Sequence, residues 1–191
     1  MNQPNKTFAP VFVRPIQPTD LNPLKALLSE LSPGTLYFRF GRLSMPIWSE
    51  EQWQDLCSPP EHCANFVATE VTGQGRYSVV GMARLVMDDT RERAEFSLVV
   101  ADTLQHSGVG RQLMHAMVGE AVRRGLSSIY GDVLPSNAVM LRFCEGLGFV
   151  ANPCPDDPRI HRMVLAIKTP KPEARSTPAS GSVLPRAPLR A

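Results

Sequence analysis

Hydrophobic positions in the N-terminal part of the chain predict one strand and two helices. Residues 11–16 are expected to form the strand. A helix should follow, capped by Thr19 or Asp20, because four leucines share one of its faces: Leu24, Leu27, Leu28 and Leu31. Pro33-Gly34 is expected to break this helix. A second helix is predicted from Ser49, where Ser-Glu-Glu-Gln resembles a capping box.

The middle of the chain predicts three consecutive strands and then a helix. Apolar stretches at 65–71, 78–86 and 93–100 are separated by turn sequences, which indicates an antiparallel meander. Residues 110–124 carry apolar side chains at helical spacing, and a glycine follows the basic end of this segment. This segment has the strongest helical pattern in the chain.

Three further elements complete the predicted domain. Residues 128–134 are expected to form a strand, and a helix should run from Ser136 or Asn137 to residue 147, closed by Gly148. Residues 159–167 alternate in polarity and predict a last strand. The order of elements indicates a mixed α/β (α+β) fold with a largely antiparallel sheet.

The C-terminal segment differs in composition from the rest. Proline and small polar residues dominate from residue 168, and such a segment buries too little apolar surface to become ordered. We therefore expect a folded domain over residues 1–167 and a disordered, proline-rich basic tail over residues 168–191. The tail carries five Lys or Arg and one Glu, so a net charge of +2 for the chain leaves −2 on the preceding residues. This balance gives no reason to expect a nucleic-acid partner.

Other bulk features narrow the class of protein. We find no run of about 18 apolar residues and no basic start followed by an apolar stretch, so we expect a cytoplasmic protein without a membrane partner. The four cysteines lack the paired spacing of a zinc site and are too few for a secreted disulfide framework. We expect reduced thiols and no metal. The oligomeric state stays open between monomer and homodimer.

The segment from Gln105 to Arg111 is the most informative for chemistry, because it joins a predicted strand to the best predicted helix. A helix N-terminus leaves about four backbone N–H groups without partners and carries roughly half a positive charge. A pyrophosphate placed there gains several hydrogen bonds, and glycines at 108 and 110 allow close approach to the backbone. The turn therefore predicts a phosphate-binding site.

Three known phosphate-binding motifs are candidates for this turn, and the spacing of the glycines distinguishes them. A dinucleotide fingerprint needs a third glycine, and a Walker loop needs Gly-Lys followed by Ser or Thr; the turn has neither. Gln105-x-x-Gly108-x-Gly110 instead resembles the Q/R-x-x-G-x-G/A acetyl-CoA motif of the GNAT superfamily of N-acetyltransferases. The resemblance covers roughly residues 11–167, and Asn137 and Leu147-Gly148-Phe149 also take part in it.

A narrower resemblance is to the acetyltransferase domain of bacterial Pat-type protein-lysine acetyltransferases. It is carried by four short segments: Arg14-Pro15-Ile16, Leu31-Ser32-Pro33, Tyr37-Phe38-Arg39-Phe40 and Arg93-Ala94-Glu95-Phe96. The wider resemblance implies the GNAT fold, a mixed and mostly antiparallel sheet of six to seven strands flanked by about four helices. It also implies acetyl-CoA as co-substrate, held by a set of nine residues: Leu98, Val100, Gln105, Ser107, Gly108, Val109, Gly110, Arg111 and Asn137.

Three residues are candidates for the chemistry. A lysine-like amine with a pKa near 10.4 must lose a proton before it attacks, and the Pat-type resemblance implies that Glu95 takes it. The alternative for Glu95 is a salt bridge to Arg84 or Arg93. The resemblance further implies that an N–H near Leu98 polarises the thioester while Val100 pairs with the pantetheine arm. Cys144 stands where many members have a tyrosine acid; it could donate a proton or simply pack.

The expected function is transfer of an acetyl group from acetyl-CoA directly to a primary amine, with protein lysine as one candidate acceptor. Two alternatives stay open: a small-molecule amine acetyltransferase, and a non-catalytic acyl-CoA-binding regulatory module. Residues 37–40 could line the acceptor groove or pack in the core. His106 and His115 are expected to be exposed.

Overall fold

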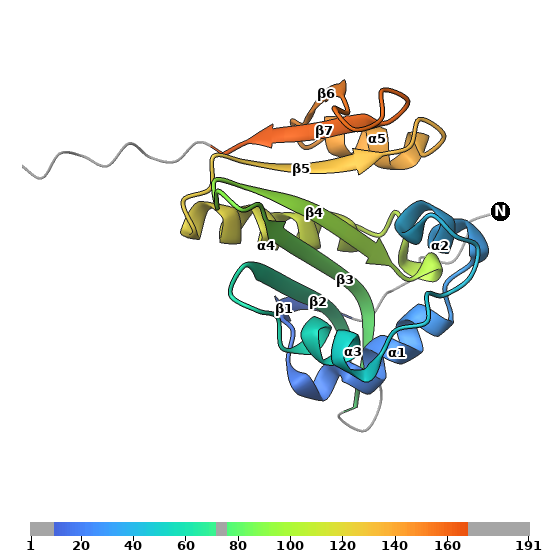
Figure 1. The fold of residues 1–191 in the computed structure, drawn as a ribbon. Helices are drawn as coiled ribbons and strands as arrows, with labels where there is room; N and C mark the ends of the chain where they lie inside the picture. Colours follow the sequence, from blue (N-terminus) through green and yellow to red (C-terminus); the bar gives the residue numbers. More distant parts are fainter. Residues whose placement is uncertain (1–9, 72–75, 168–191) are drawn as a thin grey trace, which may run out of the picture.

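The structure of the protein is a computed structural model that describes residues 10–71 and 76–167 (Figure 1). The predicted tail over 168–191 lies outside the described residues. One sheet forms the centre of the fold, with its strands in the order β1-β2-β3-β4-β5-β7-β6. The seven strands are β1 (Val11–Pro15), β2 (Cys63–Val71), β3 (Tyr77–Met87), β4 (Arg93–Val100), β5 (Ser128–Val133), β6 (Val150–Pro153) and β7 (His161–Ala166).

Only one pair of neighbouring strands in this sheet is parallel. β4 and β5 pair in parallel through Arg93–Glu95 and Ser128–Tyr130, and every other neighbouring pair is antiparallel. Beyond Glu95 the two strands separate, and Figure 1 shows β5 diverging from β4 towards the end of β4. The sheet is therefore open at its centre along the last part of β4.

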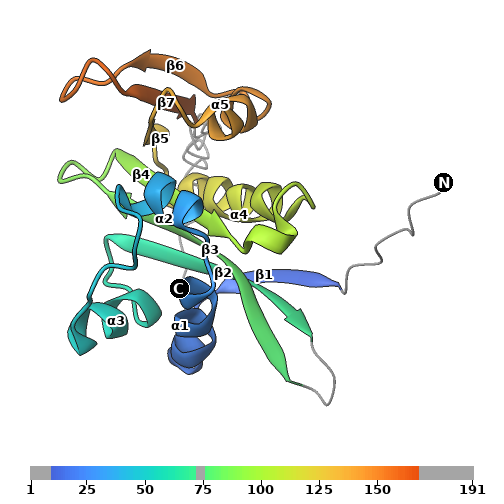
Figure 2. The same ribbon diagram turned by 90° about the vertical axis from the view of Figure 1, so that its right-hand side faces the viewer.

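Helices cover both faces of the sheet, as Figure 2 shows for α4 on one side and α1 and α3 on the other. The first face carries a core cluster built with α4 and α5, and the second carries a cluster built with α1, α2 and α3. Alternation along β4 serves both clusters, because Phe96 lies in the first and Val99 in the second. The α-helices of the described residues are α1 (Leu21–Ser29), α2 (Pro33–Phe40), α3 (Glu50–Cys57), α4 (Val109–Arg123) and α5 (Ala138–Glu145).

A buried ion pair fixes the entry to α1. Arg14 on β1 binds both carboxylate oxygens of Asp20 at 2.6 and 2.7 Å, and the Tyr77 hydroxyl donates to Asp20 at 2.8 Å. The backbone N–H of Gln17 donates to the same carboxylate at 2.8 Å. Asp20 is completely buried, and it does not cap α1 through its side chain as the sequence suggested.

The predicted fold class and sheet are confirmed, as is the capping box at Ser49, which accepts from the N–H of Gln52. The sequence did not predict α2. The first helix does end before Pro33, but Pro33 also begins α2, with Ser32 accepting a hydrogen bond from the N–H of Thr35. A proline in the first turn suits a helix start, because its missing N–H would have no partner there.

β6 was also missed, because its four residues are all exposed and show no alternation. It forms an edge strand that pairs with β7. Within the described parts of the chain, no helix is both long and apolar enough to cross a membrane.

Candidate active site

The opening between β4 and β5 places two backbone N–H groups where a ligand could reach them. Bonds from Asp88 N to the Arg93 carbonyl and from Ala101 N to the Val80 carbonyl, both 2.9 Å, fix the phase of the ladder between β3 and β4. In an antiparallel ladder, alternate residues point their N–H groups to opposite neighbours. Leu98 and Val100 therefore point theirs towards β5, from which β4 has already separated.

The turn before α4 opens the helix N-terminus. His106 and Gly108 both adopt left-handed backbone conformations, with φ of 62° and 94°. Gly108 is the N-cap of α4 and forms no side-chain cap, while the N–H of Gln112 already bonds to the Gly108 carbonyl. The N–H groups of the first helical turn, at residues 109–111, therefore have no partner inside the helix and can bind an anion.

The side chain of Gln105 stabilises this turn through hydrogen bonds. Its side-chain amide donates to Thr35 Oγ1 at 3.1 Å, to Asp102 Oδ1 at 3.2 Å and to the Val100 carbonyl at 3.4 Å. The Ser107 hydroxyl donates to the Leu104 carbonyl. Both side chains form hydrogen bonds within the protein and so stabilise the turn.

Asp102 holds α2 against the same turn, and sequence reasoning missed it. Its carboxylate accepts from Ser32 N at 2.8 Å, from Ser32 Oγ at 2.9 Å and from Thr35 Oγ1 at 2.6 Å. Desolvation alone would raise the pKa of Asp102, but these hydrogen bonds outweigh it and lower that pKa below its ordinary value. A prediction of α2 with Ser32 as its cap would have been the signal to look for such a partner.

These elements border one pocket of about 720 Å³. That volume lies in the range typical of small-molecule and cofactor sites. Phe38 and Arg39 reach it from α2, and Met140 and Phe143 from α5. Seven of the nine predicted cofactor residues line it: Leu98, Val100, Gln105, Gly108, Gly110, Arg111 and Asn137. Asn137 also caps α5, since its side chain accepts from the N–H of Met140.

Two predicted cofactor residues do not line the pocket. Val109 is a core residue with 2% exposure, and the Ser107 hydroxyl is turned back to its own loop. Any contact of these residues with a ligand would come from the backbone. The interpretation of the turn as a phosphate site rests on backbone groups in any case.

Glu95 lies on β4 just where β5 leaves it, and its side chain is exposed. In the described parts of the chain it takes part in no salt bridge. Arg93 pairs instead with Asp88 at 3.1 Å, and Arg84 contacts Cys63 Sγ at 3.4 Å. The alternative of a salt bridge from Glu95 to either arginine is therefore not found.

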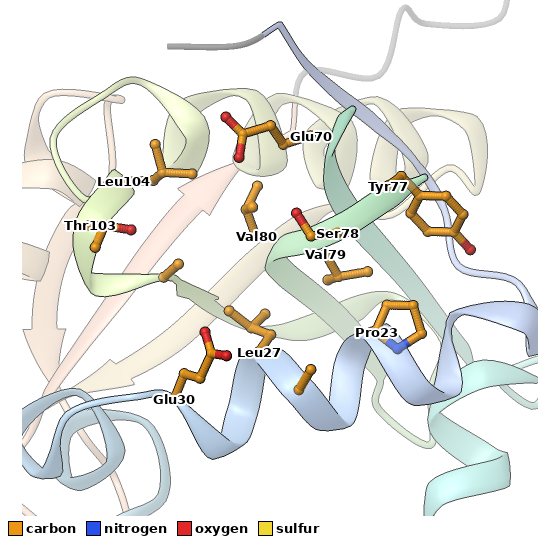
Figure 3. A pocket seen from close by; sticks show the side chains of 12 residues that line it. Pro23, Leu27, Glu30, Glu70, Tyr77, Ser78, Val79, Val80, Thr103 and Leu104 are labelled. Carbon is orange, nitrogen blue, oxygen red and sulfur yellow. The ribbon is translucent and has the colours of Figure 1, made fainter. Parts of the chain in front are cut away.

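A second pocket, of about 570 Å³, lies between α1, β3 and the loop after β4 (Figure 3). Leu27, Glu30, Glu70 and Thr103 are among its lining residues, and none of the predicted site residues is. Among the described residues, no group of three or more His, Cys, Asp or Glu side chains could hold a metal ion. The first pocket is therefore the candidate active site.

The sequence model of the Acetyltransferase (GNAT) family matches residues 26–149. The chain belongs to this family. An acetyltransferase of Pseudomonas aeruginosa, PA5475, is 30% identical over 160 residues, which cover 81% of this chain and 84% of the relative. The [ribosomal protein bS18]-alanine N-acetyltransferase of Escherichia coli is 28% identical over 102 residues, 53% of this chain and 64% of that protein. The protein is thus an acetyl-CoA-dependent N-acetyltransferase.

Solved structures carry the same fold. The GNAT domain of S. lividans PAT superposes with a TM-score of 0.69 at 21% identity, over 81% of this chain and 89% of that domain. Spermidine N-acetyltransferase from Vibrio cholerae, in complex with CoA and spermine, superposes with a TM-score of 0.64 at 19% identity, over 82% and 95%. The fold of this GNAT enzyme is therefore that of its neighbours.

The position of Cys144 in this GNAT enzyme does not suit a proton donor. The residue is completely buried in the core cluster and does not line the pocket. Burial, with a smaller effect of Glu145, raises the pKa of Cys144 to about 12. Protonation of a CoA thiolate of ordinary pKa, near 8.5, by such a thiol is unfavourable. These features favour packing, the alternative left open by the sequence, over proton donation for Cys144.

Proposed function

We propose that this GNAT enzyme transfers the acetyl group directly from acetyl-CoA to a primary amine, with Glu95 as the base. The observation that carries the proposal is the shared pocket: outward-facing N–H groups on β4 and the open N-terminus of α4 border the same cavity. One end can hold a thioester and the other a pyrophosphate. A single ligand with both groups is acetyl-CoA.

The proposed binding mode uses the backbone throughout. The pyrophosphate accepts hydrogen bonds from the first-turn N–H groups of α4, beyond the Gly108 N-cap. The pantetheine arm lies along the exposed edge of β4 and pairs with Val100. The thioester oxygen then faces the N–H of Leu98. A preorganised donor of this kind lowers the barrier by about 3 kcal/mol, because the oxygen gains negative charge in the transition state.

Glu95 supplies the base in this mechanism. The amine loses a proton to the carboxylate, directly or through a water molecule, and its nitrogen attacks the thioester carbon. The carbon–sulfur bond breaks as the carbon–nitrogen bond forms, and CoA leaves as a thiolate. The absence of a salt bridge to Glu95 in the described residues supports this role, because pairing with arginine would make the carboxylate a weaker base.

The departing thiolate does not require a protein acid. A thiol with a pKa near 8.5 is a good leaving group compared with an amine or an alcohol. The proton taken by Glu95 can pass through solvent to the product thiolate, since Glu95 is exposed. The replacement of the usual tyrosine by Cys144 therefore leaves the proposed transfer intact.

Two measurements on the whole protein test the proposal. Calorimetric titration with acetyl-CoA measures binding, and detection of released CoA thiol with a panel of lysine peptides, amino acids and polyamines measures transfer. We expect micromolar binding and acceptor-dependent thiol release. Binding without release for every acceptor would favour the acyl-CoA-binding module, and no binding at all would remove the proposed site.

A further inference from the structure

Two arginines from different elements meet on the face of the sheet that carries Glu95. Arg39 of α2 donates from Nη2 to Ser97 Oγ at 2.9 Å, and Arg84 of β3 stands directly opposite Ser97 in the ladder. Residues paired in register share a face, as do residues two apart on one strand. Arg39 and Arg84, here called the arginine pair, therefore lie next to Glu95 along β4.

The arginine pair forms no ion pair with a carboxylate in the part of the chain that the structure describes. Within residues 10–71 and 76–167, seven other arginines form ion pairs, but Arg39 and Arg84 form none. The Arg84 guanidinium donates a 3.4 Å hydrogen bond to Cys63 Sγ, which is a weak acceptor. Its Nε is shielded from solvent and has no hydrogen-bond partner among the described residues.

Positive charge is in excess beside Ser97. Burial and the charge of Arg84 lower the pKa of Arg39 to about 10, and the charge of Glu95 only partly opposes them. Arginine side chains stay charged in proteins. Two positive charges and one negative charge therefore share a partly buried region, and a single added negative charge would balance them.

One member of the arginine pair, Arg39, lines the acetyl-CoA pocket, and Arg84 and Glu95 lie beside it on β3 and β4, outside the residues that line the pocket. An acceptor that presents its amine between Glu95 and the thioester would therefore place its remaining atoms beside Arg39 and Arg84. Glu95 and Ser97 are two residues apart on β4, which corresponds to about 7 Å along the strand. A small molecule can span this distance.

We infer that the acceptor is a small amine that carries a carboxylate, with the amine at Glu95 and the carboxylate bound by Arg39 and Arg84; this inference rests on the function proposed above. Planar guanidinium groups match a carboxylate with paired hydrogen bonds. The carboxylate of the acceptor then faces two guanidinium groups and its ammonium group faces Glu95, so each charge lies beside an opposite one. A polyamine would instead bring further positive charge to the arginine pair, which repels it.

Matched acceptors test the inference. Glycine, β-alanine and γ-aminobutyrate are each compared with the corresponding amide, which keeps the amine and the length but lacks the charge; spermidine serves as the cationic member. We expect the best acid to exceed its amide at least about tenfold in kcat/KM, because the amide loses the charged hydrogen bonds. Equal values for each pair, or a preference for amides or spermidine, would overturn the inference.

Substitution of the arginines tests whether they cause the preference for an acid over its amide. Arg84→Met keeps the length of the side chain without its charge. Arg159→Met is the control, because Arg159 is exposed and forms its ion pair with Asp157, two residues away in the sequence. Arg84→Met should reduce the preference for the acid at least about tenfold through KM, while acetyl-CoA affinity and the control stay unchanged. An unchanged preference in Arg84→Met would contradict the inference. If Arg84→Met does not fold, judged by circular dichroism, Arg39→Met gives the same comparison.

Binding separates this inference from the proposed function. If acetyl-CoA binds but no acceptor releases thiol, the proposed transfer fails, and the acids and amides are then titrated against the CoA-saturated protein. Tighter binding of an acid than of its amide, lost in Arg84→Met, supports the carboxylate site without any turnover. Equal binding, or no binding of any acid, overturns it.

Discussion

Thr35 on α2 donates a 2.6 Å hydrogen bond to Asp102, which lies in the loop between β4 and α4. The same carboxylate accepts from Ser32 and from the side chain of Gln105. One acidic side chain therefore ties the helix that carries Arg39 to the turn that precedes α4. The two walls of the pocket are positioned relative to each other by this contact.

Replacing Asp102, which also lines the pocket, should weaken acetyl-CoA binding by releasing the turn before α4. In Asp102→Ala the loop loses its anchor to α2, and a loss of about 1 kcal/mol of preorganisation corresponds to about a fivefold higher Kd. Calorimetry with acetyl-CoA measures the change. Asp157→Ala is the control, because it removes a partly exposed aspartate whose partner is Arg159. An affinity equal to that of the unaltered protein would show that the anchor does not position the turn.

Glu95→Gln should abolish most of the turnover and preserve cofactor binding. Glutamine keeps the size of the side chain but cannot accept the amine proton, so we expect kcat to fall about 100-fold or more. The acetyl-CoA Kd should change less than twofold, because Glu95 does not line the pocket. Thiol release and calorimetry provide the two values. Glu92→Gln, on the exposed turn before β4, is the control; a Glu95→Gln enzyme as fast as this control would exclude the base.

Much of the fold was predictable because periodicity along the chain reports which side chains face the core. The apolar spacing in α4 and the Ser49 capping box are local signals, and the structure confirms both elements. Pro33 was ambiguous, since the same residue ends one helix and begins another. β6 gave no signal, because its residues are exposed on both faces.

The candidate site was predictable only where it depends on a local motif. The motif of the glycine turn lies within seven consecutive residues, 105–111, and the structure places it at the N-terminus of α4. The Asp102 anchor joins residues 70 positions apart, and the contact of Arg39 with Ser97 spans 58. Such pairs arise from the packing of α2 on the sheet, which was not predicted. The charge balance around Glu95 could therefore not be foreseen from spacing.

Gly110→Glu should remove acetyl-CoA binding altogether. Gly110 lines the pocket in the first turn of α4, and the new carboxylate would meet the pyrophosphate with a like charge. We expect the Kd to rise at least about 100-fold. Gly119→Glu is a matched control on the same helix, since nothing lies within 4 Å of a Cβ placed there. Gly110→Ala should bind normally, because the nearest atom to its Cβ is 3.7 Å away. Tight binding by Gly110→Glu would place the pyrophosphate elsewhere.

Cys144→Ala should keep its catalytic rate. The thiol is buried away from the pocket, so its removal affects packing and not proton transfer. We expect kcat within about twofold of the unaltered enzyme over pH 6–9 and a free energy of unfolding lower by about 1 kcal/mol. Steady-state kinetics and urea unfolding measure these quantities. A loss of kcat that grows with pH, without a loss of stability, would restore Cys144 as the acid.

Asp20→Asn should cost about 3–5 kcal/mol of the free energy of unfolding, because it leaves Arg14 without its buried partner. Desolvation alone would raise the pKa of Asp20, but hydrogen bonds from Arg14, Gln17 and Tyr77 lower it below the usual value. The unfolded chain therefore binds this proton at a higher pH than the folded protein does. The stabilisation by Asp20 is complete above the unfolded pKa, near 3.9, and disappears as the pH falls through the folded value.

The difference in free energy of unfolding between the unaltered protein and Asp20→Asn, measured by urea unfolding at several pH values, isolates this contribution from those of other carboxylates. It should be constant from pH 7 to about pH 5 and shrink below about pH 4, where the carboxylate of the unaltered protein becomes protonated. Asp157→Asn, at an exposed pair, should show a much smaller difference at every pH. A difference for Asp20→Asn that is independent of pH would mean that packing around the side chain, and not its charge, stabilises the junction of β1 and α1.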